Sequence, residues 1–369
     1  MAIKRIGILT GGGDAPGLNP AIRAAVWKAA ELGIEMVGLY DGWQGLLDGY
    51  SDETRALDVE LTRYWDLDGG THLGSSRTNP FNRAEGGKKV DVSDQVIANM
   101  KKLGLDALIP IGGEDTLGVA ARLAKKGAPV VGIPKTIDKD LGGTDYTLGF
   151  DTSMRTCADI IERSRTPAGS HHWVQVVEVM GRHAGHLALW SGLAGGAYIT
   201  LIPEAPFSLE RVIEFIDERL ERGKRDRRYP RYAVVVIAEG ALPTGGSEVT
   251  VEQKVDAFGH ARLGGIGAWL ADQIRQKTPW DSRSVALGHP QRGGVPSPID
   301  RIMGHLFGTA AVEACVRSDW GKMVSARGIA PACRVGLVAL EEATRGLNLV
   351  DVARDYTSDR YQVSRRVLD

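Results

Sequence analysis

A charged stretch directly follows the apolar run APVVGIP, and its residue types can transfer protons and bind anions. Residues 130–150 read VVGIPKTIDKDLGGTDYTLGF. Asp138 and Asp140 stand two positions apart, so both carboxylates face the same way if the segment is extended. One of them could accept a proton from a substrate hydroxyl while the other assists a metal or orients the substrate. Lys135 adds a positive charge three residues before Asp138. A solvated loop of this composition would be unremarkable, so its position in the fold decides between the two interpretations.

A glycine-rich segment, TGGGDAPG at residues 10–17, links an apolar run to an amphipathic one. Glycines let backbone N–H groups approach a phosphate, and the N-terminus of the following helix adds partial positive charge. The dinucleotide spacing G-x-G-x-x-G narrowly fails: Gly11 and Gly13 fit, but Gly17 comes one residue late. No Walker A sequence is present. A tight turn without a ligand explains this segment equally well.

Two acids follow another apolar run in GGEDT, residues 112–116. Carboxylates at a strand end can hold Mg²⁺, usually one or two of them together with substrate phosphates. Glu114 and Asp115 could instead decorate the N-terminus of a helix, where the helix dipole favours negative charge.

The second half of the chain supplies cations suited to phosphate. Arg182 and His183 stand in MGRHAG, and Arg283, His289 and Arg292 stand in SRSVALGHPQRGG. The planar guanidinium of arginine matches the oxygens of a phosphate group, although any single arginine is more often a surface residue. The basic run at 221–231 is best explained as a solvated connection, with a phosphate effector site as the alternative.

The elements that must position these residues alternate between short apolar runs and longer amphipathic ones. Continuous apolar runs predict strands buried on both faces, at 5–10, 105–111, 128–133, 174–180, 198–202, 232–238 and 282–287. Asn19 before Pro20 predicts the N-cap of a helix that extends to about Leu32, and Ser208 and Ser297 are expected to cap helices at 209–222 and 298–317.

Strands and helices in alternation predict doubly wound parallel sheets. The pattern favours two such sheets, one over roughly 1–150 and the other over roughly 151–291, with the helix after Ser297 packing on either. In open parallel sheets, ligands bind beyond the carboxyl ends of the strands. TGGGDAPG, IGGEDT, PKTIDKD and EVMGRHAG all follow predicted strands, so each is a candidate part of a site.

Bulk composition fits a soluble globular protein and excludes several partners. The chain has 369 residues, 43% hydrophobic and 25% charged, with a formal net charge of -1. That balance offers no field for nucleic acid or an anionic membrane. No apolar run is long enough to span a membrane, the N-terminal apolar stretch is too short for a signal peptide, and a cytoplasmic location is expected. Cys157, Cys315 and Cys333 stand far apart, which indicates reduced thiols, and His183 and His186 lack a third metal ligand.

Taken together, these segments resemble the phosphofructokinase family. GGxDAPGxN, LGSSR, GG-acid-x-T, P-x-TID-x-D, GTDYT-x-GF, EVMGRHAG and LGH-x-QRGG appear in order between residue 5 and about residue 310. The resemblance implies two Rossmann-like, three-layer α/β domains with mostly parallel sheets and an active site in the cleft between them. It implies Mg²⁺-assisted phosphoryl transfer to the 1-hydroxyl of fructose 6-phosphate, a reaction of glycolysis and gluconeogenesis.

The resemblance also implies a role for each matching residue. Asp138 would take the proton from the sugar hydroxyl, with Asp140 in support and Thr136 touching the transferring group. Glu114 falls at the position of the magnesium carboxylate. Gly13 and Arg77 would hold the donor phosphates. The sugar phosphate would be bound by Met180, Gly181, Arg182, Glu239, His289 and Arg292, and by Arg283 from a neighbouring subunit.

The phosphoryl donor is indicated by two positions. Members that use ATP have glycine at the positions of Asp115 and Lys135, whereas this chain reads GGEDT and PKTID, as pyrophosphate-dependent members do. The carboxylate of Asp115 would repel the α-phosphate of ATP, and Lys135 could stabilise a phosphate leaving group. Pyrophosphate is therefore the expected donor. An ATP-dependent enzyme of the same family and a non-catalytic sugar-phosphate-binding subunit are the alternatives.

Two departures from the family pattern bear on subunit contacts and regulation. Trp173 stands where bacterial members usually carry a second subunit-crossing arginine. Arg23 matches an effector-binding arginine of allosteric members, but Trp27 stands where a second would be, so regulation is not expected to follow that pattern. A homodimer or homotetramer is expected. The expected domains are 1–149, completed by part of 292–345, for the donor, and 150–291 for the sugar phosphate, with 346–369 as a C-terminal extension.

Overall fold

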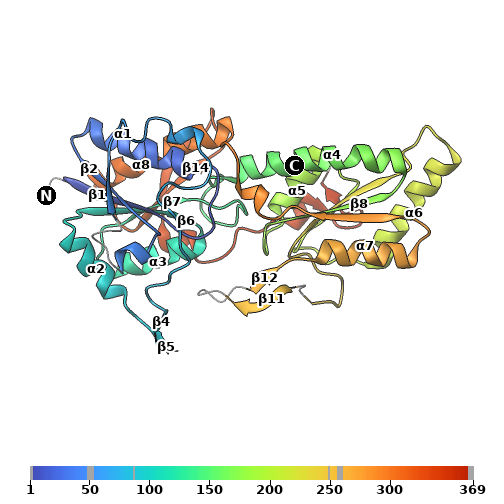
Figure 1. The fold of residues 1–369 in the computed structure, drawn as a ribbon, viewed down its shortest axis with the longest axis horizontal. Helices are drawn as coiled ribbons and strands as arrows, with labels where there is room; N and C mark the ends of the chain where they lie inside the picture. Colours follow the sequence, from blue (N-terminus) through green and yellow to red (C-terminus); the bar gives the residue numbers. More distant parts are fainter. Residues whose placement is uncertain (1–2, 48–53, 86–87, 248–249, 256–260, 365–369) are drawn as a thin grey trace. The chain divides into compact units, whose positions relative to one another are not determined.

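The computed structural model describes residues 3–47, 54–85, 88–247, 250–255 and 261–364. Within it the chain divides into two compact units, each with its own parallel sheet (Figure 1). Unit 1 consists mainly of Met1–Thr152 and Arg292–Leu347. Unit 2 consists mainly of Ser153–Lys254, Ala261–Gln291 and Asn348–Asp369, so the expected C-terminal extension supplies residues to unit 2.

Unit 1 contains a seven-stranded sheet in the order β15-β14-β7-β6-β1-β2-β3. The strands are β1 (Arg5–Thr10), β2 (Glu35–Leu39), β3 (Thr54–Leu57), β6 (Ala107–Gly112), β7 (Val131–Pro134), β14 (Lys322–Arg327) and β15 (Arg334–Ala339). The inner pairs are parallel, and the outermost strands β3 and β15 pair antiparallel with their neighbours. Helices cover both faces of the parallel part, as expected for strands that are buried throughout.

Side chains of β1 alternate between two hydrophobic cores. Ile6 and Ile8 belong to the core formed with α1 (Leu18–Glu31) and α8 (Pro298–Val316). Leu9 belongs to the opposite core, which also contains residues of α2 (Ser93–Lys102) and α3 (Glu114–Lys125). Unit 1 is therefore a three-layer sandwich with one strand set between two helical layers.

Helices α1 and α8 approach each other closely because glycines stand at their contact. A Cβ added at Gly304 would lie 2.7 Å from Cβ of Pro20, and one at Gly308 would lie 2.9 Å from Cβ of Ala24. The helix after Ser297 thus packs on unit 1, where α8 joins the core that contains β1.

Unit 2 contains a four-stranded, wholly parallel sheet in the order β13-β8-β10-β9. Its strands are β8 (Val174–Val179), β9 (Ile199–Leu201), β10 (Ala233–Ala238) and β13 (Ser282–Ala286). Its helices are α4 (Phe150–His171), which begins in unit 1, α5 (His186–Gly195), α6 (Leu209–Arg225) and α7 (Ile266–Lys277). All seven strand positions predicted from apolar runs are strands, and the expected α/β class is confirmed.

Two of the three predicted helix caps are confirmed and one is wrong. Oγ of Ser208 accepts from the Arg211 amide at 3.2 Å, and Oγ of Ser297 accepts from the Asp300 amide at 3.1 Å. The N-cap of α1 is Gly17, with φ 119°, rather than Asn19. The amide group of Asn19 instead donates to the carbonyls of Asp68 and Gly69, because a long-range partner outcompetes the local capping geometry.

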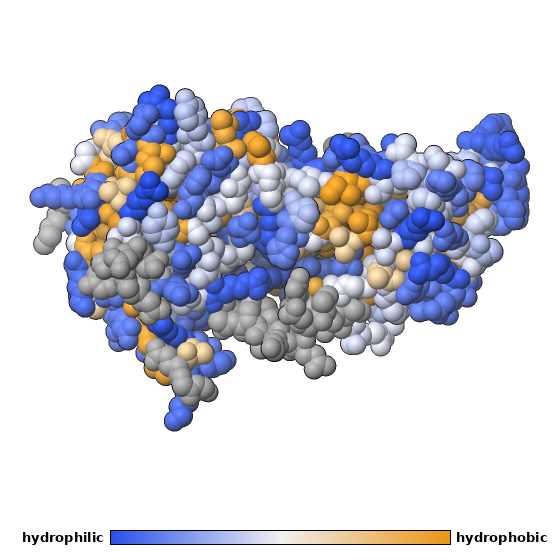
Figure 2. Space-filling model, viewed as in Figure 1, coloured by the Kyte–Doolittle hydropathy of each residue, from blue (hydrophilic) through white to orange (hydrophobic). Residues whose placement is uncertain are grey.

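The remaining elements are short. They are η1 (Gln44–Leu46), η2 (Trp65–Leu67), β4 (Arg83–Glu85), β5 (Lys88–Val90), β11 (Thr250–Val255), β12 (Ala261–Leu263), η3 (His289–Arg292), α9 (Leu340–Ala343), α10 (Val352–Asp355), β16 (Tyr356–Thr357) and β17 (Gln362–Val363). On the face shown in Figure 2, hydrophobic side chains gather in small groups among hydrophilic ones. No helix in the described residues is long and apolar enough to cross a membrane.

Candidate active site

The carboxyl ends of β1, β6 and β7 bring three of the predicted segments to one edge of the unit 1 sheet. Thr10 pairs with Ile111, and Gly112 pairs with Pro134, so the residues after each pair start side by side. The Gly11 amide donates to the Ile111 carbonyl, and the Lys135 amide donates to the Gly112 carbonyl, both at 3.0 Å. The glycine-rich loop, the acidic pair and the charged stretch therefore meet at one sheet edge.

Glycine is required at the start of this loop because it packs against the first turn of α3. A Cβ added at Gly11 would lie 2.6 Å from Oγ1 of Thr116. Gly12 has φ 77°, a conformation that favours glycine. The chain can thus pass close to the residues that follow β6.

Lys135 is a buried cation held under the glycine-rich loop. The side chain is 3% exposed, and Nζ donates to the carbonyl oxygens of Gly11, at 3.2 Å, and Gly13. Burial, helped by the nearby Arg292 cation, lowers the pKa of Lys135 to about 7. The carboxylates of Asp138 and neighbouring acids act in the opposite direction. A lysine that changes charge close to neutral pH therefore lies against the glycine-rich loop.

Asp138 presents a carboxylate oxygen that lacks a protein partner. The residue is 5% exposed, and Oδ1 is buried with no hydrogen bond among the described residues. Its backbone amide donates to Oγ1 of Thr136 at 3.1 Å, which fixes the turn. Lys139 follows with φ 58°, so the chain turns sharply between Asp138 and Asp140. A buried acceptor without a partner costs free energy unless a ligand supplies a donor.

A second segment supports this turn from behind. Oγ1 of Thr147 donates to the carbonyl of Thr136 at 2.8 Å, and the Leu148 amide donates to the Pro134 carbonyl at 3.1 Å. Lys135 and Leu148 also form a parallel β-bridge. The charged residues are thus mounted on paired backbone rather than on a free loop.

Asp300 fixes the supporting segment and was not predicted from the sequence. It is fully buried, and its carboxylate accepts from the Tyr146 hydroxyl at 2.7 Å, from the Gly149 amide at 2.7 Å and from Thr152 through both its amide, at 2.9 Å, and its hydroxyl, at 2.5 Å. Burial raises the pKa of Asp300 to about 6 against these hydrogen bonds. An acid three residues after a Ser cap fits a local capping pattern, which does not indicate these long-range contacts.

The other residues predicted for the donor also lie in unit 1. Glu114 and Asp115 are the first two residues of α3, and both are partly buried. Arg77 is exposed. Gly13 lies against Arg292, whose guanidinium a Cβ at Gly13 would strike.

Arg292 and the rest of the predicted sugar-phosphate set are assigned to different units. Nη1 of Arg292 donates to the Asp14 carbonyl at 3.0 Å, and the residue belongs to unit 1. Met180, Gly181, Arg182, Glu239, Arg283 and His289 all belong to unit 2. The boundary between the units falls inside η3, directly before Arg292, and a sequence pattern does not report it.

The ends of β8 and β10 bring the MGRHAG segment and Glu239 together. Val179 pairs with Ala238, and Oε1 of Glu239 accepts from the Arg182 amide at 3.1 Å. Gly181 has φ 138° and Arg182 has φ 49°, so this turn holds two consecutive residues in a conformation that most residues avoid.

Arg283 of β13 lies over the ring of Trp173, the residue directly before β8. The guanidinium carbon of Arg283 is 4.1 Å from the ring centroid of Trp173, and His171 stacks on the same ring with centroids 5.0 Å apart. Nε1 of Trp173 donates to Oε1 of Gln175 at 3.2 Å. Arg283 is exposed, and so is His289 beyond the end of β13. Two donors of Arg283, Nε and Nη2, lie 3.4 Å from Oδ2 of Asp281, so Arg283 is held by both an aromatic face and an exposed carboxylate.

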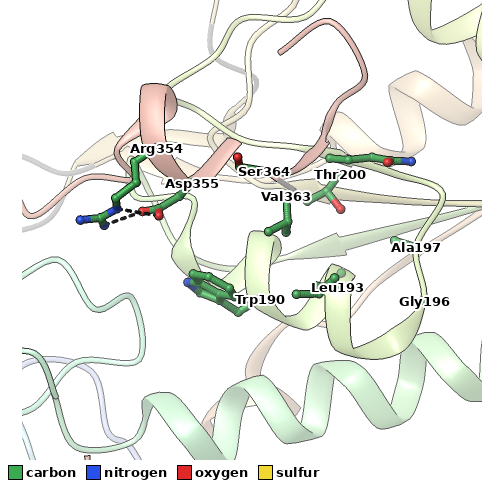
Figure 3. A pocket seen from close by; sticks show the side chains of 11 residues that line it. Trp190, Leu193, Gly196, Ala197, Thr200, Arg354, Asp355, Val363 and Ser364 are labelled. Atoms are coloured by element: carbon green, nitrogen blue, oxygen red, sulfur yellow. Dashed lines mark hydrogen bonds and ion pairs between the residues drawn. The ribbon is translucent and has the colours of Figure 1, made fainter. Parts of the chain in front are cut away.

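A pocket of about 670 Å³ lies elsewhere in unit 2 (Figure 3). Trp190, Leu193 and Ala197 line it from α5 and the turn that follows. Arg354 and Asp355, which form an ion pair, line it from the C-terminal segment. Its described lining includes none of the residues predicted for catalysis. We therefore assign the candidate active site to the charged strand ends and not to this pocket.

The fold defines a class of protein: a two-unit, doubly wound α/β protein with the charged segments at the carboxyl ends of its strands. The comparison with families makes the assignment specific. A family model described as phosphofructokinase matches residues 5–315. The chain belongs to the phosphofructokinase family.

Similar proteins carry two different donor names. The pyrophosphate–fructose 6-phosphate 1-phosphotransferase of Amycolatopsis methanolica is 50% identical over 352 residues, covering 95% of this chain and 97% of that protein. The ATP-dependent 6-phosphofructokinase of Chloroflexus aurantiacus (strain ATCC 29366 / DSM 635 / J-10-fl) is 46% identical over 353 residues, covering 94% and 93%. The solved phosphofructokinase of Saccharomyces cerevisiae matches with a TM-score of 0.76 at 28% identity over 93% of this chain, which spans 45% of that one.

Proposed function

We propose that this protein transfers a phosphoryl group from pyrophosphate to the 1-hydroxyl of fructose 6-phosphate, reversibly and with Mg²⁺. The products are fructose 1,6-bisphosphate and phosphate. Relatives favour pyrophosphate, since those of 48–51% identity are named for pyrophosphate and those named for ATP are 42–47% identical. The residues at the edge of the unit 1 sheet give the physical reason for that choice.

The observation that carries the proposal is the buried Lys135 ammonium bonded to the glycine-rich loop. An ammonium at that position stabilises charge on a small phosphate group held by the loop. With pyrophosphate as donor the leaving group is phosphate itself, which carries its charge close to the transferred group. A lysine at this depth suits that leaving group.

Asp115 argues against a nucleoside triphosphate in the same place. It lies in the first turn of α3, beside the glycine-rich loop and the charged stretch. Two like charges about 4 Å apart repel by roughly 4 kcal/mol at an effective dielectric of ~20, which corresponds to about a thousandfold in binding. Pyrophosphate ends before the position of an α-phosphate and avoids that repulsion.

Asp138 is proposed to act as the general base. Its unpartnered Oδ1 accepts the proton of the sugar 1-hydroxyl, and the oxygen of that hydroxyl then attacks the phosphoryl group. Thr136 contacts the transferring group, and Asp140 supports the base. Gly13 and Arg77 bind the donor phosphates. Phosphoryl transfer has little covalent chemistry for the protein to perform, so positioning and charge neutralisation provide most of the rate.

The residues at this edge fit Mg²⁺. Their ligand atoms are carboxylate oxygens. The described residues contain no group of three or more His, Cys, Asp or Glu that could hold a metal by itself, so substrate oxygens would have to complete the site. One or two carboxylates completed by substrate phosphates are the usual Mg²⁺ arrangement. We propose Glu114 as the magnesium carboxylate. When bound, the ion neutralises charge on the phosphates.

Unit 2 is proposed to bind the sugar phosphate. Arg182 and His289 supply donors from one chain, and Arg283 supplies them to a neighbouring subunit of a homodimer or homotetramer. Met180, Gly181 and Glu239 shape the turn that presents Arg182. The sequence also predicted Arg292 for the sugar phosphate, and that role stays a prediction. A cytoplasmic location is part of the same proposal.

Phosphorus NMR of the reaction in both directions tests the proposed activity. With fructose 6-phosphate, pyrophosphate and Mg²⁺, we expect the pyrophosphate signal to give equal amounts of phosphate and a sugar 1-phosphate signal. With fructose 1,6-bisphosphate and phosphate, we expect pyrophosphate to appear. Absence of turnover in both directions, with fructose 6-phosphate still binding, would favour a non-catalytic subunit instead.

A further inference from the structure

The MGRHAG turn of unit 2 is held by three side-chain acceptors. The Met180 amide donates to Oε1 of Gln291 at 3.0 Å, the Arg182 amide donates to Oε1 of Glu239 at 3.1 Å, and the Gly185 amide donates to Oε1 of Glu204 at 2.8 Å. With two consecutive left-handed residues, this turn depends on such contacts to keep its shape. The third contact, at the start of α5, leads away from the predicted site.

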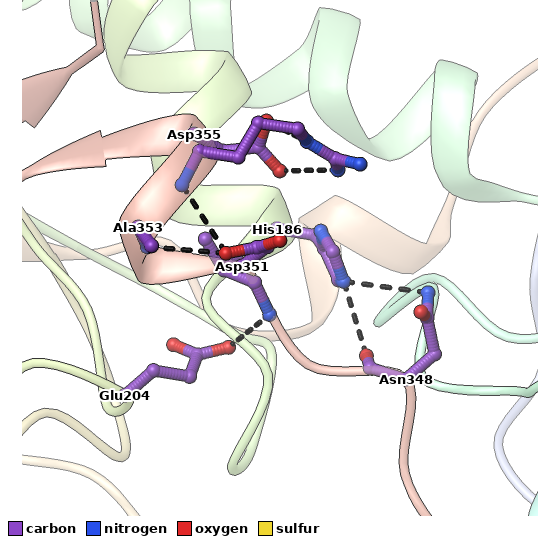
Figure 4. Close-up of polar contacts among 8 residues, drawn as sticks. His186, Glu204, Asn348, Asp351, Ala353 and Asp355 are labelled. Atoms are coloured by element: carbon purple, nitrogen blue, oxygen red, sulfur yellow. Dashed lines mark hydrogen bonds and ion pairs between the residues drawn. The ribbon is translucent and has the colours of Figure 1, made fainter.

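Glu204 joins the turn to the C-terminal segment (Figure 4). Its Oε1 also accepts from the Val350 amide at 2.9 Å. Nε2 of His186, the first residue of α5, donates to the Asn348 carbonyl at 3.0 Å. We call residues 348–351 the C-terminal brace. The brace therefore contacts the end of the turn through one carboxylate and one imidazole.

The chain beyond the brace is itself anchored on unit 2. The carboxylate of Asp351 accepts from the amides of Ala353 and Arg354, which caps α10. The Tyr356 hydroxyl donates to the Thr200 carbonyl at 2.7 Å, and the Thr200 amide donates to the Tyr361 carbonyl at 2.8 Å. The two contacts with Thr200 hold the brace in place against the edge strand β9.

We propose that Glu204 is a positioning residue for sugar-phosphate binding and that the C-terminal brace holds it in place. This inference rests on the proposed role of Arg182. The phosphofructokinase model ends at residue 315, so the brace lies beyond the region that defines the family. The second oxygen of Glu204, Oε2, is buried with no hydrogen bond among the described residues. The carboxylate therefore depends on the Gly185 and Val350 amides, and loss of either frees it to move.

Steady-state kinetics on four variants test the inference. Glu204→Ala should raise the KM for fructose 6-phosphate about ten-fold, leave the KM for the phosphoryl donor unchanged and change kcat less than about three-fold. Glu204→Gln keeps an oxygen acceptor and should restore most of the affinity. Val350→Pro removes the amide donated by the brace, fixes φ at that position, and should act like Glu204→Ala. Ala353→Pro removes an amide contact in the same segment that does not reach Glu204, and should leave the KM unchanged.

The results separate the brace from the proposed function. If Arg182→Ala leaves the KM for fructose 6-phosphate unchanged, the proposed role of the turn is wrong. If Arg182→Ala weakens binding and Glu204→Ala and Val350→Pro do not, only the brace is wrong. An equal effect of Ala353→Pro and Val350→Pro would also overturn it, since general loosening would then explain both. Melting temperatures identify any variant that fails to fold. If Glu204→Ala does not fold, the KM for fructose 6-phosphate is compared in Glu204→Gln and Val350→Pro. A rise in Val350→Pro alone supports the brace, and equal KM values in the two variants overturn it.

Discussion

At the scale of single residues, unit 1 keeps a cation and a carboxylate out of water within one short stretch. Lys135 and Asp138 are both buried, and only the lysine has its hydrogen bonds supplied by the protein. Buried charges cost stability, and proteins retain them where they carry function. The unpartnered oxygen of Asp138 is an acceptor that a substrate hydroxyl could use.

Asp138→Asn should lower kcat by about 100-fold or more, the usual scale for losing a general base. The change keeps the shape of the side chain, so the KM for fructose 6-phosphate should change little. Steady-state turnover assays measure kcat, and an equilibrium titration with fructose 6-phosphate measures binding of the sugar phosphate. Near-normal turnover in a folded variant would remove Asp138 from its role.

Lys135 should make donor binding depend on pH. Its pKa is lowered to about 7, so the ammonium is present below that pH and is lost as the pH rises. The kcat/KM for the donor reports the free enzyme and should be highest below pH ~7 and fall above it. The kcat should fall at a higher pH, because a bound anion raises the pKa again. A flat donor profile between pH 6 and 9 would contradict a catalytic ammonium.

At the scale of elements, strand ends position the chemistry. The sequence predicted the strands well where they are continuous apolar runs, as in β1, β8 and β10. It missed β2, where Glu35 and Gly38 interrupt the run, because pairing with β1 supplies the stability that the local pattern lacks. It also missed β14, where Ser325 interrupts the apolar run, and β15, an edge strand with exposed positions.

Contacts between distant parts of the chain account for the rest of what the sequence did not reveal. The hydrogen bonds of Lys135 to Gly11 and Gly13, and of Glu204 to Val350, join positions more than one hundred residues apart. Residue types at each position suggested chemistry, but only the packed chain shows which charges meet. Trp173 is an example. From the sequence it was only a departure from an arginine position of the family, whereas in the structure its ring packs against Arg283.

The stack of Arg283 on Trp173 should support sugar-phosphate binding. Arg283→Ala should raise the KM for fructose 6-phosphate about ten-fold or more, since it removes a charged hydrogen bond worth ~1.5–3 kcal/mol. Trp173→Leu should raise it about two- to five-fold, the scale of an exposed cation–π contact. Trp280→Leu, a matched change at another tryptophan of unit 2, is the control. An unchanged KM in Arg283→Ala would exclude this arginine from the site.

Asp300 should be one of the most sensitive positions for the stability of unit 1. Asp300→Ala leaves the donors of Tyr146, Gly149 and Thr152 buried without an acceptor, at a cost of at least about 3 kcal/mol. For a unit of this size the melting temperature should fall by roughly 6–12 °C. Asp159→Ala, which removes an exposed ion pair with Arg163, should change it little. Equal shifts in the two variants would contradict the structural role.

At the scale of the whole molecule, the two units divide the proposed tasks. The residues proposed for the donor and for proton transfer all belong to unit 1, and the residues that shape the MGRHAG turn belong to unit 2. The C-terminal segment returns to unit 2 after the helix and strands that complete unit 1. Because the chain crosses between the units more than once, each unit is built from segments that are far apart in the sequence.

The central claim is that Asp115 and Lys135 make pyrophosphate the donor, and a donor comparison tests it most directly. The kcat/KM for pyrophosphate and for ATP, at saturating fructose 6-phosphate and Mg²⁺, is measured on the parent protein and on Asp115→Gly. We predict that the parent uses pyrophosphate and almost no ATP, and that Asp115→Gly loses pyrophosphate activity and admits ATP. Efficient use of ATP by the parent protein would contradict the account.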